Sequence, residues 1–509
     1  MRGELRRPGK QADEPIAMRD VLFEYNLNPT TWAYISSLMI IGIFFKFHRF
    51  FSVRNLDIIG LIALAPGLLL VTHQKEQLGY VWLFCVGGFF LVRLLVDPLM
   101  VRRPFLEPNL SAAGLTFTAA ALLVFLLANV VTSRPTQGDL EGARRLEQIL
   151  ARKQVPIGQS SLDQYGPGYP FFYVFASFAN KAFLPLHEGD SEQARREELE
   201  VATARMTAIL AHLALVAALI VTGLRHFDNI HTGVAAAALY LLLPYTAQMT
   251  SRVDNIVPAA LLTWAAAAYR RPMIAGVLVG LAGGVIYYPL FLLPLWCGFY
   301  WQRGMFRFLG GTALALGLLI ASLSFTSSDA AHFAEQMRQM FGFRNPLEVQ
   351  LSGFWEYHDR AFRIPVMVAF VALCGSLAIW PPQKNFGTLV SCSAAVMLGT
   401  QFWHVQHGGI YMAWYLPLLI LTVFRPNLED RVARSAVIDR PAWWRRWLAS
   451  RRRPAAGGRA NGTPATGEPT PDRPASNATA AQGPSADALA PRGGATPLPG
   501  PTVLPAARE

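Results

Sequence analysis

Long apolar blocks separated by short polar links make up most of this chain. The blocks run for about 14 to 22 residues, close to the ~20 residues that a helix needs to cross a bilayer at 1.5 Å per residue. The pattern therefore predicts an all-α, polytopic membrane protein with about 12–13 transmembrane helices. The predicted spans are 31–45, 56–71, 80–95, 111–131, 203–224, 234–249, 256–269, 273–286, 288–301, 309–325, 365–380, 388–402 and 411–424.

Two long polar stretches interrupt the apolar pattern, at 132–202 and 326–362. In the first, a segment that starts at Asp139 has the pattern of an amphipathic surface helix, and the apolar stretch 171–186 is expected to lie along the membrane surface. The predicted divisions are a polar N-terminal segment at 1–30, three accessory transmembrane helices at 31–110, a transmembrane core at 111–425, a basic Trp-rich interfacial segment at 426–453 and a disordered tail at 454–509.

The basic residues indicate how the chain is oriented. The formal net charge is +12, but Arg and Lys gather in alternate short links and in the tail rather than on one soluble face. They are topology signals, and nucleic acid is not an expected partner. Because positive links face the cytoplasm, the loops at 132–202, 250–255, 326–362 and 403–410 are expected outside it. The tail after Arg425 is expected inside it.

The C-terminal segments and the cysteines narrow the picture further. Trp443, Trp444 and Trp447 flank a pair of arginines, a composition typical of the headgroup zone at the cytoplasmic surface. The stretch 454–509 is rich in Pro, Ala and Gly and has too few large apolar residues to form a core, so we expect disorder. The four cysteines all lie in predicted spans without CxxC spacing, which supports neither disulfides nor a zinc site.

The predicted external loops carry the candidate chemistry. The first loop holds three carboxylates that can serve as a general base, Asp139, Glu141 and Asp163. Asp163 precedes Tyr165 and Tyr169 in a Y-G-P-G-Y-P run, which must turn sharply and can hold a side chain in a defined geometry. Each of these carboxylates can equally be solvated surface, because the loop is rich in acidic residues.

Two further external turns place polar groups beside aromatic ones. Arg252 and Asp254 stand at the mouth of a predicted span, where they can bind a ligand or form a local ion pair. His404 and His407 precede Tyr411 in the last external turn. Two imidazoles there can contact a phosphate or simply occupy the membrane interface. No cluster with metal-ligand spacing is apparent, although a divalent cation remains an open option.

Several short motifs follow one another in a distinctive order. They are D-Q-Y-G-P at 163–167, P-Y-T at 244–246, R-V-D-N at 252–255, A-G-V-L-V-G-L-A-G-G at 275–284, Y-Y-P-L at 287–290, H-V-Q-H at 404–407 and Y-M-A-W-Y-L-P-L at 411–418. In this order the chain resembles the GT-C membrane glycosyltransferases. Within them it is most similar to the family 87 polyprenyl-phosphate-mannose-dependent mannosyltransferases, over the core at 111–425.

The resemblance implies a defined reaction. A hexose, with mannose expected, would pass from a polyprenyl-phosphate carrier to the hydroxyl of a lipid or glycan acceptor on the non-cytoplasmic face of the cell membrane. The base would be an acidic residue of the first external loop, and Asp163 matches first, ahead of Asp139 and Glu141. The expected substrate-binding residues are Tyr165, Tyr169, Arg252, Asp254, His404, His407 and Tyr411.

Two departures from the family pattern keep other functions open. The predicted external loops lack an adjacent Asp-Asp or Glu-Asp pair, and Tyr287 and Tyr288 stand where relatives commonly have a lysine. A catalytically altered homologue that acts as a lipid-binding membrane scaffold is therefore an alternative. A transporter is another, although the predicted spans hold few charges and no repeat is visible. The sequence does not decide between sugars or acceptors.

Overall fold

The computed structural model describes residues 28–73, 75–100, 106–151, 165–183, 192–327, 329–341 and 351–438. Within these residues the regular structure is helical, with no strand and one isolated bridge between Asn385 and Val432. The predicted all-α class is therefore confirmed. The predicted N-terminal segment up to residue 27, the predicted Trp-rich segment from residue 439 and the whole predicted tail at 454–509 lie outside the described residues.

Six helical segments of the described chain are long and apolar enough to cross a membrane. They overlap α3 (Val53–Thr72), α4 (Glu76–Val96), α5 (Ala112–Thr132), α8 (Glu192–His226), α14 (Met305–Thr326) and α16 (Arg363–Ile379). A segment of about 20 apolar residues matches the hydrocarbon thickness of a bilayer. The protein is therefore of the membrane-embedded type.

The other predicted spans are helical as well, but they are shorter. They are α2 (Pro29–Phe44), α9 (Ile230–Leu242), α10 (Pro244–Gln248), α11 (Val253–Ala267), α12 (Pro272–Val285), η5 (Tyr288–Leu292), α13 (Leu293–Tyr300), α17 (Phe386–Gln401), η8 (Met412–Trp414) and α18 (Leu416–Phe424). Every residue of α17 and α18 is buried, so protein surrounds these helices. Their backbone groups are satisfied internally, and full bilayer length is not needed there.

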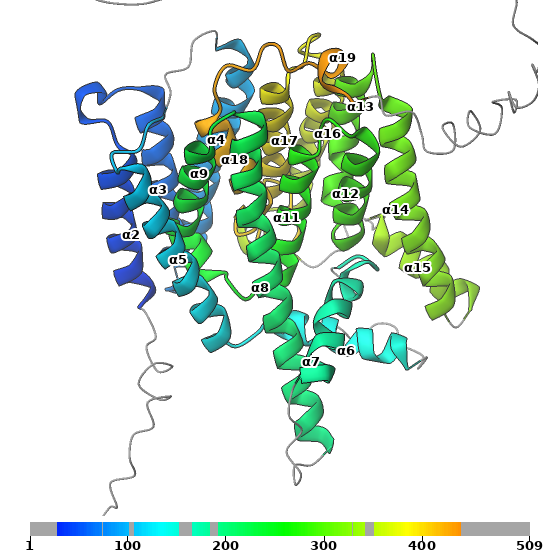
Figure 1. The fold of residues 1–509 in the computed structure, drawn as a ribbon. Coiled ribbons are helices and arrows are strands. Elements are labelled where there is room, and N and C mark those ends of the chain that lie inside the picture. The colour runs from blue at the N-terminus through cyan, green and yellow to red at the C-terminus, as the bar shows by residue number, and fades with distance from the viewer. Residues whose placement is uncertain are drawn as a thin grey trace, which may run out of the picture. The chain divides into compact units, whose positions relative to one another are not determined.

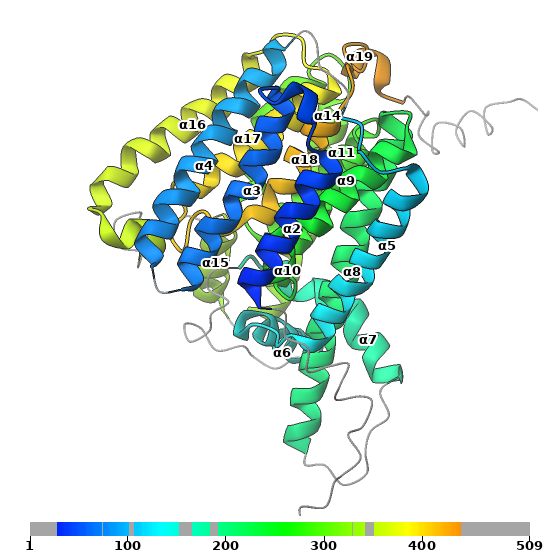
Figure 2. The same ribbon diagram turned by 90° about the vertical axis from the view of Figure 1, so that its left-hand side faces the viewer.

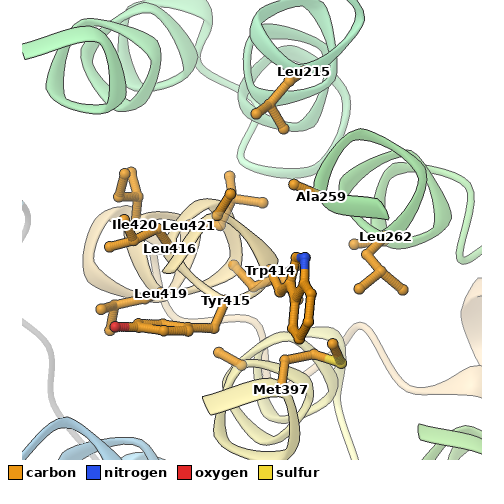
Figure 3. Close-up of a cluster of buried hydrophobic side chains, with 14 of the residues drawn as sticks. Leu215, Ala259, Leu262, Met397, Trp414, Tyr415, Leu416, Leu419, Ile420 and Leu421 are labelled. Atoms are coloured by element: carbon orange, nitrogen blue, oxygen red, sulfur yellow. The ribbon is translucent and has the colours of Figure 1, made fainter. Parts of the chain in front are cut away.

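The interior of the bundle is packed around α18. In Figure 3 the side chains of α18 lie in one cluster with Leu215 of α8, Leu262 of α11 and Met397 of α17, all of which are buried. The ring of Trp414, just before α18, lies in the same cluster. Inside a membrane, van der Waals packing of this kind holds helices together. Trp414 also connects this core to the candidate site.

Helices α12 and α14 approach each other at backbone distance. A Cβ atom on Gly276 would lie 2.1 Å from the carbonyl oxygen of Phe308, and one on Gly311 would lie 2.1 Å from that of Met273. Only residues without a side chain permit this approach. Helix packing, rather than phosphate binding, therefore explains the glycine run in α12.

The bundle has two distinct ends. Figures 1 and 2 show α6 (Gln137–Leu150) and α7 (Val174–Phe183) at one end, here named the α6 end, and α19 (Ala433–Ala436) at the other, named the α19 end. Helix α15 (Ala330–Met340) lies at the α6 end (Figure 1). The described parts of the two long polar stretches thus share one end. The predicted amphipathic helix at Asp139 is α6.

Candidate functional site

Helix α6 begins with a capping box and is held to its neighbours by ion pairs. The Asp139 amide donates to the Thr136 hydroxyl at 3.3 Å, while Asp139 Oδ2 accepts from the Thr136 amide at 3.2 Å and from its hydroxyl at 2.6 Å. Such a box satisfies N–H groups that a helix start leaves unpaired. Arg144 then binds Glu200 of α8 through two hydrogen bonds of 2.9 and 2.8 Å. The start of α6 is therefore fixed against α8.

The second oxygen of Asp139 joins three elements. Asp139 Oδ1 accepts hydrogen bonds from the Tyr169 hydroxyl at 2.7 Å, the Tyr173 hydroxyl at 3.3 Å and the Val253 amide at 3.1 Å. Tyr169 and Tyr173 belong to η4 (Tyr169–Tyr173), and Val253 begins α11. Together with the two hydrogen bonds from Thr136, the carboxylate accepts five hydrogen bonds, and Asp139 is fully buried. Asp139 is thus an anchor between α6, η4 and α11.

Burial also changes the acidity of this anchor. Loss of solvent, and secondarily the negative charge of Asp254, raise the pKa of Asp139 to about 6. The hydrogen bonds from Thr136, Tyr169 and Val253 act in the opposite direction. A carboxyl group that titrates this close to neutrality at a buried position is a feature of functional sites, although structural networks also produce it.

Arg252 and Asp254 form an ion pair beside this anchor, as one of the two readings of the sequence expected. Arg252 Nη2 lies 2.8 Å from Asp254 Oδ2, and Nε lies 3.3 Å from Oδ1. The Tyr165 hydroxyl donates to Asp254 Oδ2 at 3.2 Å. The Asp254 side chain is 2% exposed and that of Arg252 is 25% exposed, so the arginine is the part of the pair that solvent or a ligand can reach.

The turn that carries Tyr165 is held against the end of α12. The Gly166 amide donates to the Val285 carbonyl at 2.7 Å, and the Gly168 amide donates to the Gly284 carbonyl at 2.9 Å. A Cβ atom on Gly166 would lie only 2.2 Å from the Gly284 oxygen, so glycine is required here. The sharp turn predicted from Y-G-P-G-Y-P is therefore confirmed, and α12 holds it in place.

A third segment closes the cluster with aromatic rings. The Arg252 guanidinium lies 5.5 Å from the centre of the Tyr411 ring, within the range of a cation–π contact. The His404 ring lies tilted against the same ring, with centroids 4.5 Å apart. The Trp414 indole N–H donates to the Asp254 backbone carbonyl at 3.4 Å. Residues from three separate parts of the sequence thus meet at the α6 end.

The two histidines have different surroundings. Burial lowers the pKa of His404 to about 3, so the ring is neutral at physiological pH, and its Nδ1 lies 2.6 Å from the Gln406 carbonyl oxygen. His407 Nδ1 instead lies 2.8 Å from the hydroxyl of Tyr80 in α4, and burial lowers its pKa as well. Neutral imidazoles stabilise a phosphate poorly. Arg252 is therefore the better phosphate ligand of the three candidates.

Of the other two candidate carboxylates, the described residues include only Glu141. Asp163, first choice for the base, lies outside the described residues. Glu141 is half-buried on α6 and interacts electrostatically with Arg144, so it belongs to the contact between α6 and α8. In the described part of the chain, no group of three His, Cys, Asp or Glu side chains is placed to hold a metal ion.

Sequence reasoning missed several residues of this region. The Tyr173 hydroxyl lies within hydrogen-bond distance of Asp139 and of the Tyr169 hydroxyl. Its spacing of four residues from Tyr169 could have indicated that the two side chains lie together. Arg363 is buried at the start of α16, where its Nε donates to the Trp403 carbonyl at 2.7 Å. The Tyr80 contact to His407 joins residues 327 positions apart, and no local pattern reveals such a contact.

Fold and site together define an all-helical protein of membrane type with a buried, charged and aromatic cluster at one end of its bundle. No protein-family profile matches the chain, and no curated protein matches it. The function is therefore argued from the site and from the motif order.

Proposed function

We propose that the protein is an integral-membrane glycosyltransferase of the GT-C type. It transfers a hexose, with mannose the expected sugar, from a polyprenyl-phosphate carrier to an acceptor hydroxyl on the non-cytoplasmic face. The observation that carries the proposal is the meeting of Asp139, the Arg252–Asp254 pair and Tyr411 at the α6 end. Contacts that span 114 and 160 residues of sequence build this cluster. The order of the motifs along the chain would not by itself require such a meeting.

Each group has a place in the proposed transfer. The acceptor oxygen attacks C1 of the sugar while the bond from C1 to the phosphate oxygen breaks, so the electron pair leaves with the phosphate and the hydroxyl proton passes to a base. Arg252, with five N–H donors and partial exposure, stabilises the departing phosphate. Asp254 holds Arg252, and Tyr411 lies beneath its guanidinium.

The base of this proposal remains Asp163. A carboxylate offers about four lone-pair positions, and Asp139 already accepts five hydrogen bonds within the protein. Asp139 therefore acts as a positioning residue. Asp163 precedes Tyr165 by two positions in the chain, and Tyr165 is tied to Asp254. This tie supports the assignment made from the D-x-Y-G-P run.

Orientation in the membrane is part of the proposal. The link from α11 to α12 contains Arg271, the link from α16 to α17 contains Lys384, and α19 contains Arg434. These segments lie at the α19 end (Figure 1), which faces the cytoplasm in this proposal under the positive-inside rule. The α6 end then faces outward, where the carrier and acceptor meet. In this proposal the short buried helices also cross the membrane, which gives the total of about 12–13 transmembrane helices predicted from the sequence.

The decisive experiment measures sugar transfer by Arg252→Gln protein in lipid nanodiscs, with polyprenyl-phosphate mannose as donor. Loss of one charged phosphate ligand should lower transfer by about 10²-fold or more, the scale of a lost oxyanion donor. Arg196→Gln is the matched control, because Arg196 is 64% exposed on α8 and pairs only with Glu192 in the described residues. Equal transfer by the wild type and Arg252→Gln would refute the assignment of Arg252.

A lipid-binding homologue without transferase activity is the second candidate. Tyr288, one of the two tyrosines in the element where relatives commonly carry a lysine, is buried and stacks on Trp414 with centroids 5.4 Å apart. Its ring fills the position with aromatic packing instead of a cation. Donor binding by wild-type protein without any transfer to lipid or glycan acceptors would favour this alternative over the enzyme.

A further inference from the structure

A pocket of about 750 Å³ opens at the α19 end, the opposite end of the bundle from the cluster described above (Figure 1). It is formed where α13 packs against α16 and α19. Figure 1 shows these three helices beside one another at that end. None of the residues that line this pocket belongs to the site at the α6 end.

The inner wall of the pocket is a tight helix contact. A Cβ atom on Gly298 of α13 would lie 2.3 Å from the carbonyl oxygen of Ala378 in α16, so the two backbones touch there. Beyond this contact the helices leave an apolar crevice lined by Cys297 and Ile379. Trp301 and Ile379 are 72% and 80% exposed. Exposed Trp and Ile next to one another at a helix end are typical of a surface that faces lipid near the headgroups.

The mouth of the pocket is positively charged. Its lining contains the buried Lys384 and the exposed Arg434, and no carboxylate occurs among the lining residues that the structure describes. Lys384 Nζ donates to the carbonyls of Ala378 at 3.0 Å and Pro381 at 2.9 Å. An ammonium has three N–H groups, so a third donor remains for a ligand. Arg303 Nη1 donates to the Arg434 carbonyl at 2.7 Å and thereby fixes the backbone of that residue.

We propose that this pocket binds an anionic phospholipid, with the phosphate between Lys384 and Arg434 and an acyl chain along α13 and α16. The cations alone would suit any phosphate, but the apolar crevice and the exposed Trp301 and Ile379 continue directly from them. A free phosphate would leave this apolar surface uncovered. Basic pockets between helices at the cytoplasmic side of membrane proteins select anionic headgroups in this way. The proposal does not depend on sugar transfer, but it rests on the membrane orientation proposed above, with the α19 end facing the cytoplasm.

The first test is native mass spectrometry of the full chain released from nanodiscs that contain equal amounts of phosphatidylglycerol and phosphatidylcholine. We expect phosphatidylglycerol to be retained at least 10-fold more often, and Arg434→Gln and Lys384→Gln each to reduce this preference at least 5-fold. Arg271→Gln is the control, because Arg271 is an exposed arginine at the same end that does not line the pocket. An unchanged preference in both pocket variants overturns the proposal.

The second test locates the lipid without any substitution, which matters because Lys384 also binds two backbone carbonyls. A photoactivatable phosphatidylglycerol should cross-link to peptides that cover 294–302 and 378–384. Cross-links that fall only elsewhere contradict the proposal. Complete displacement by millimolar inorganic phosphate would contradict it too, since the occupant would then be the free ion rather than a lipid.

Discussion

At the scale of single residues, Asp139 illustrates how burial changes the meaning of a side chain. Sequence reasoning placed it among three candidate bases, but the structure saturates its oxygens with donors from three elements. The buried carboxylate is therefore suited to positioning the start of α11 and its Arg252–Asp254 pair. The same burial raises its pKa, and that shift gives a measurable pH dependence.

Asp139→Asn should change how stability depends on pH. The pKa of Asp139 is raised from 3.8 to about 6 in the folded protein. As the pH rises from 3.8 to 6, the unfolded chain therefore loses this proton before the folded protein does, and the free energy of unfolding falls. Each unit of pKa shift corresponds to about 1.4 kcal/mol. Between pH 4.5 and pH 7, the wild type should therefore lose thermal stability relative to Asp139→Asn, by about 2 kcal/mol.

The measurement is the thermal midpoint in detergent at both pH values. Asparagine also loses a capping acceptor at Thr136, worth about 1 kcal/mol at either pH, so the sign of the pH-dependent difference is the decisive quantity. Glu192→Gln is the control, because the Glu192 side chain is 88% exposed. Parallel pH curves for the wild type and Asp139→Asn would show that Asp139 does not titrate as proposed.

At the scale of elements, the turn at Tyr165 depends on a contact with α12 as well as on its own glycines. Its glycine amides bond to the last carbonyls of α12, which a helix end leaves without internal partners. The close packing of α12 on α14 in turn fixes that helix end. The position of Tyr165 beside Asp254 therefore follows from two successive glycine contacts.

Gly166→Ala should break this arrangement. The new methyl group would meet the Gly284 carbonyl oxygen at 2.2 Å, which forces the turn away from α12 and costs about 1–3 kcal/mol. We expect a lower thermal midpoint and a loss of sugar transfer, because Tyr165 would leave Asp254. Gly317→Ala is the control, since a Cβ atom on Gly317 of α14 meets nothing within 4 Å. Similar behaviour of the two variants would mean that the turn adapts without the contact.

At the scale of the whole molecule, a buried ion network joins the accessory helices to the core. Arg93 of α4 bonds to Asp57 of α3 at 2.9 and 3.0 Å and to Asp97 at 2.9 Å. Arg425, just after α18, forms an ion pair with the same Asp97. The charges inside the first spans are thus paired with one another, which is typical of intramembrane ionisable groups. Asp97 is the residue that both arginines share.

Asp97→Asn should therefore loosen α3 and α4 from the core. Removing one partner of a buried pair leaves uncompensated charge and typically costs about 3–5 kcal/mol. We expect a marked fall of the thermal midpoint, and faster proteolysis of the accessory helices than of the core. Asp430→Asn is the control, because the Asp430 side chain is 78% exposed beside Arg431. A stability equal to that of the wild type would show that the network is dispensable.

Much of the architecture was readable from local patterns. The apolar blocks predicted the positions of the helices, because a helix satisfies its own backbone and needs no distant partner. The start of α6 is set by Thr136 and Asp139 only three residues apart, and the turn at Gly166 by adjacent glycines and prolines. The dense glycines of α12 likewise indicated close helix packing.

The tertiary structure decided which of these elements meet. Nothing near Asp139 in the sequence indicates that its carboxylate binds the Val253 amide 114 residues away, or that Arg252 lies on Tyr411. The short length of α18 could not be predicted from the sequence either, because a helix can be this short only where neighbouring helices, rather than lipid, surround it. The local pattern of apolar and polar residues indicates on which face of a helix a residue lies. The burial of that residue, its pKa and its hydrogen-bond partners arise only when distant segments pack together.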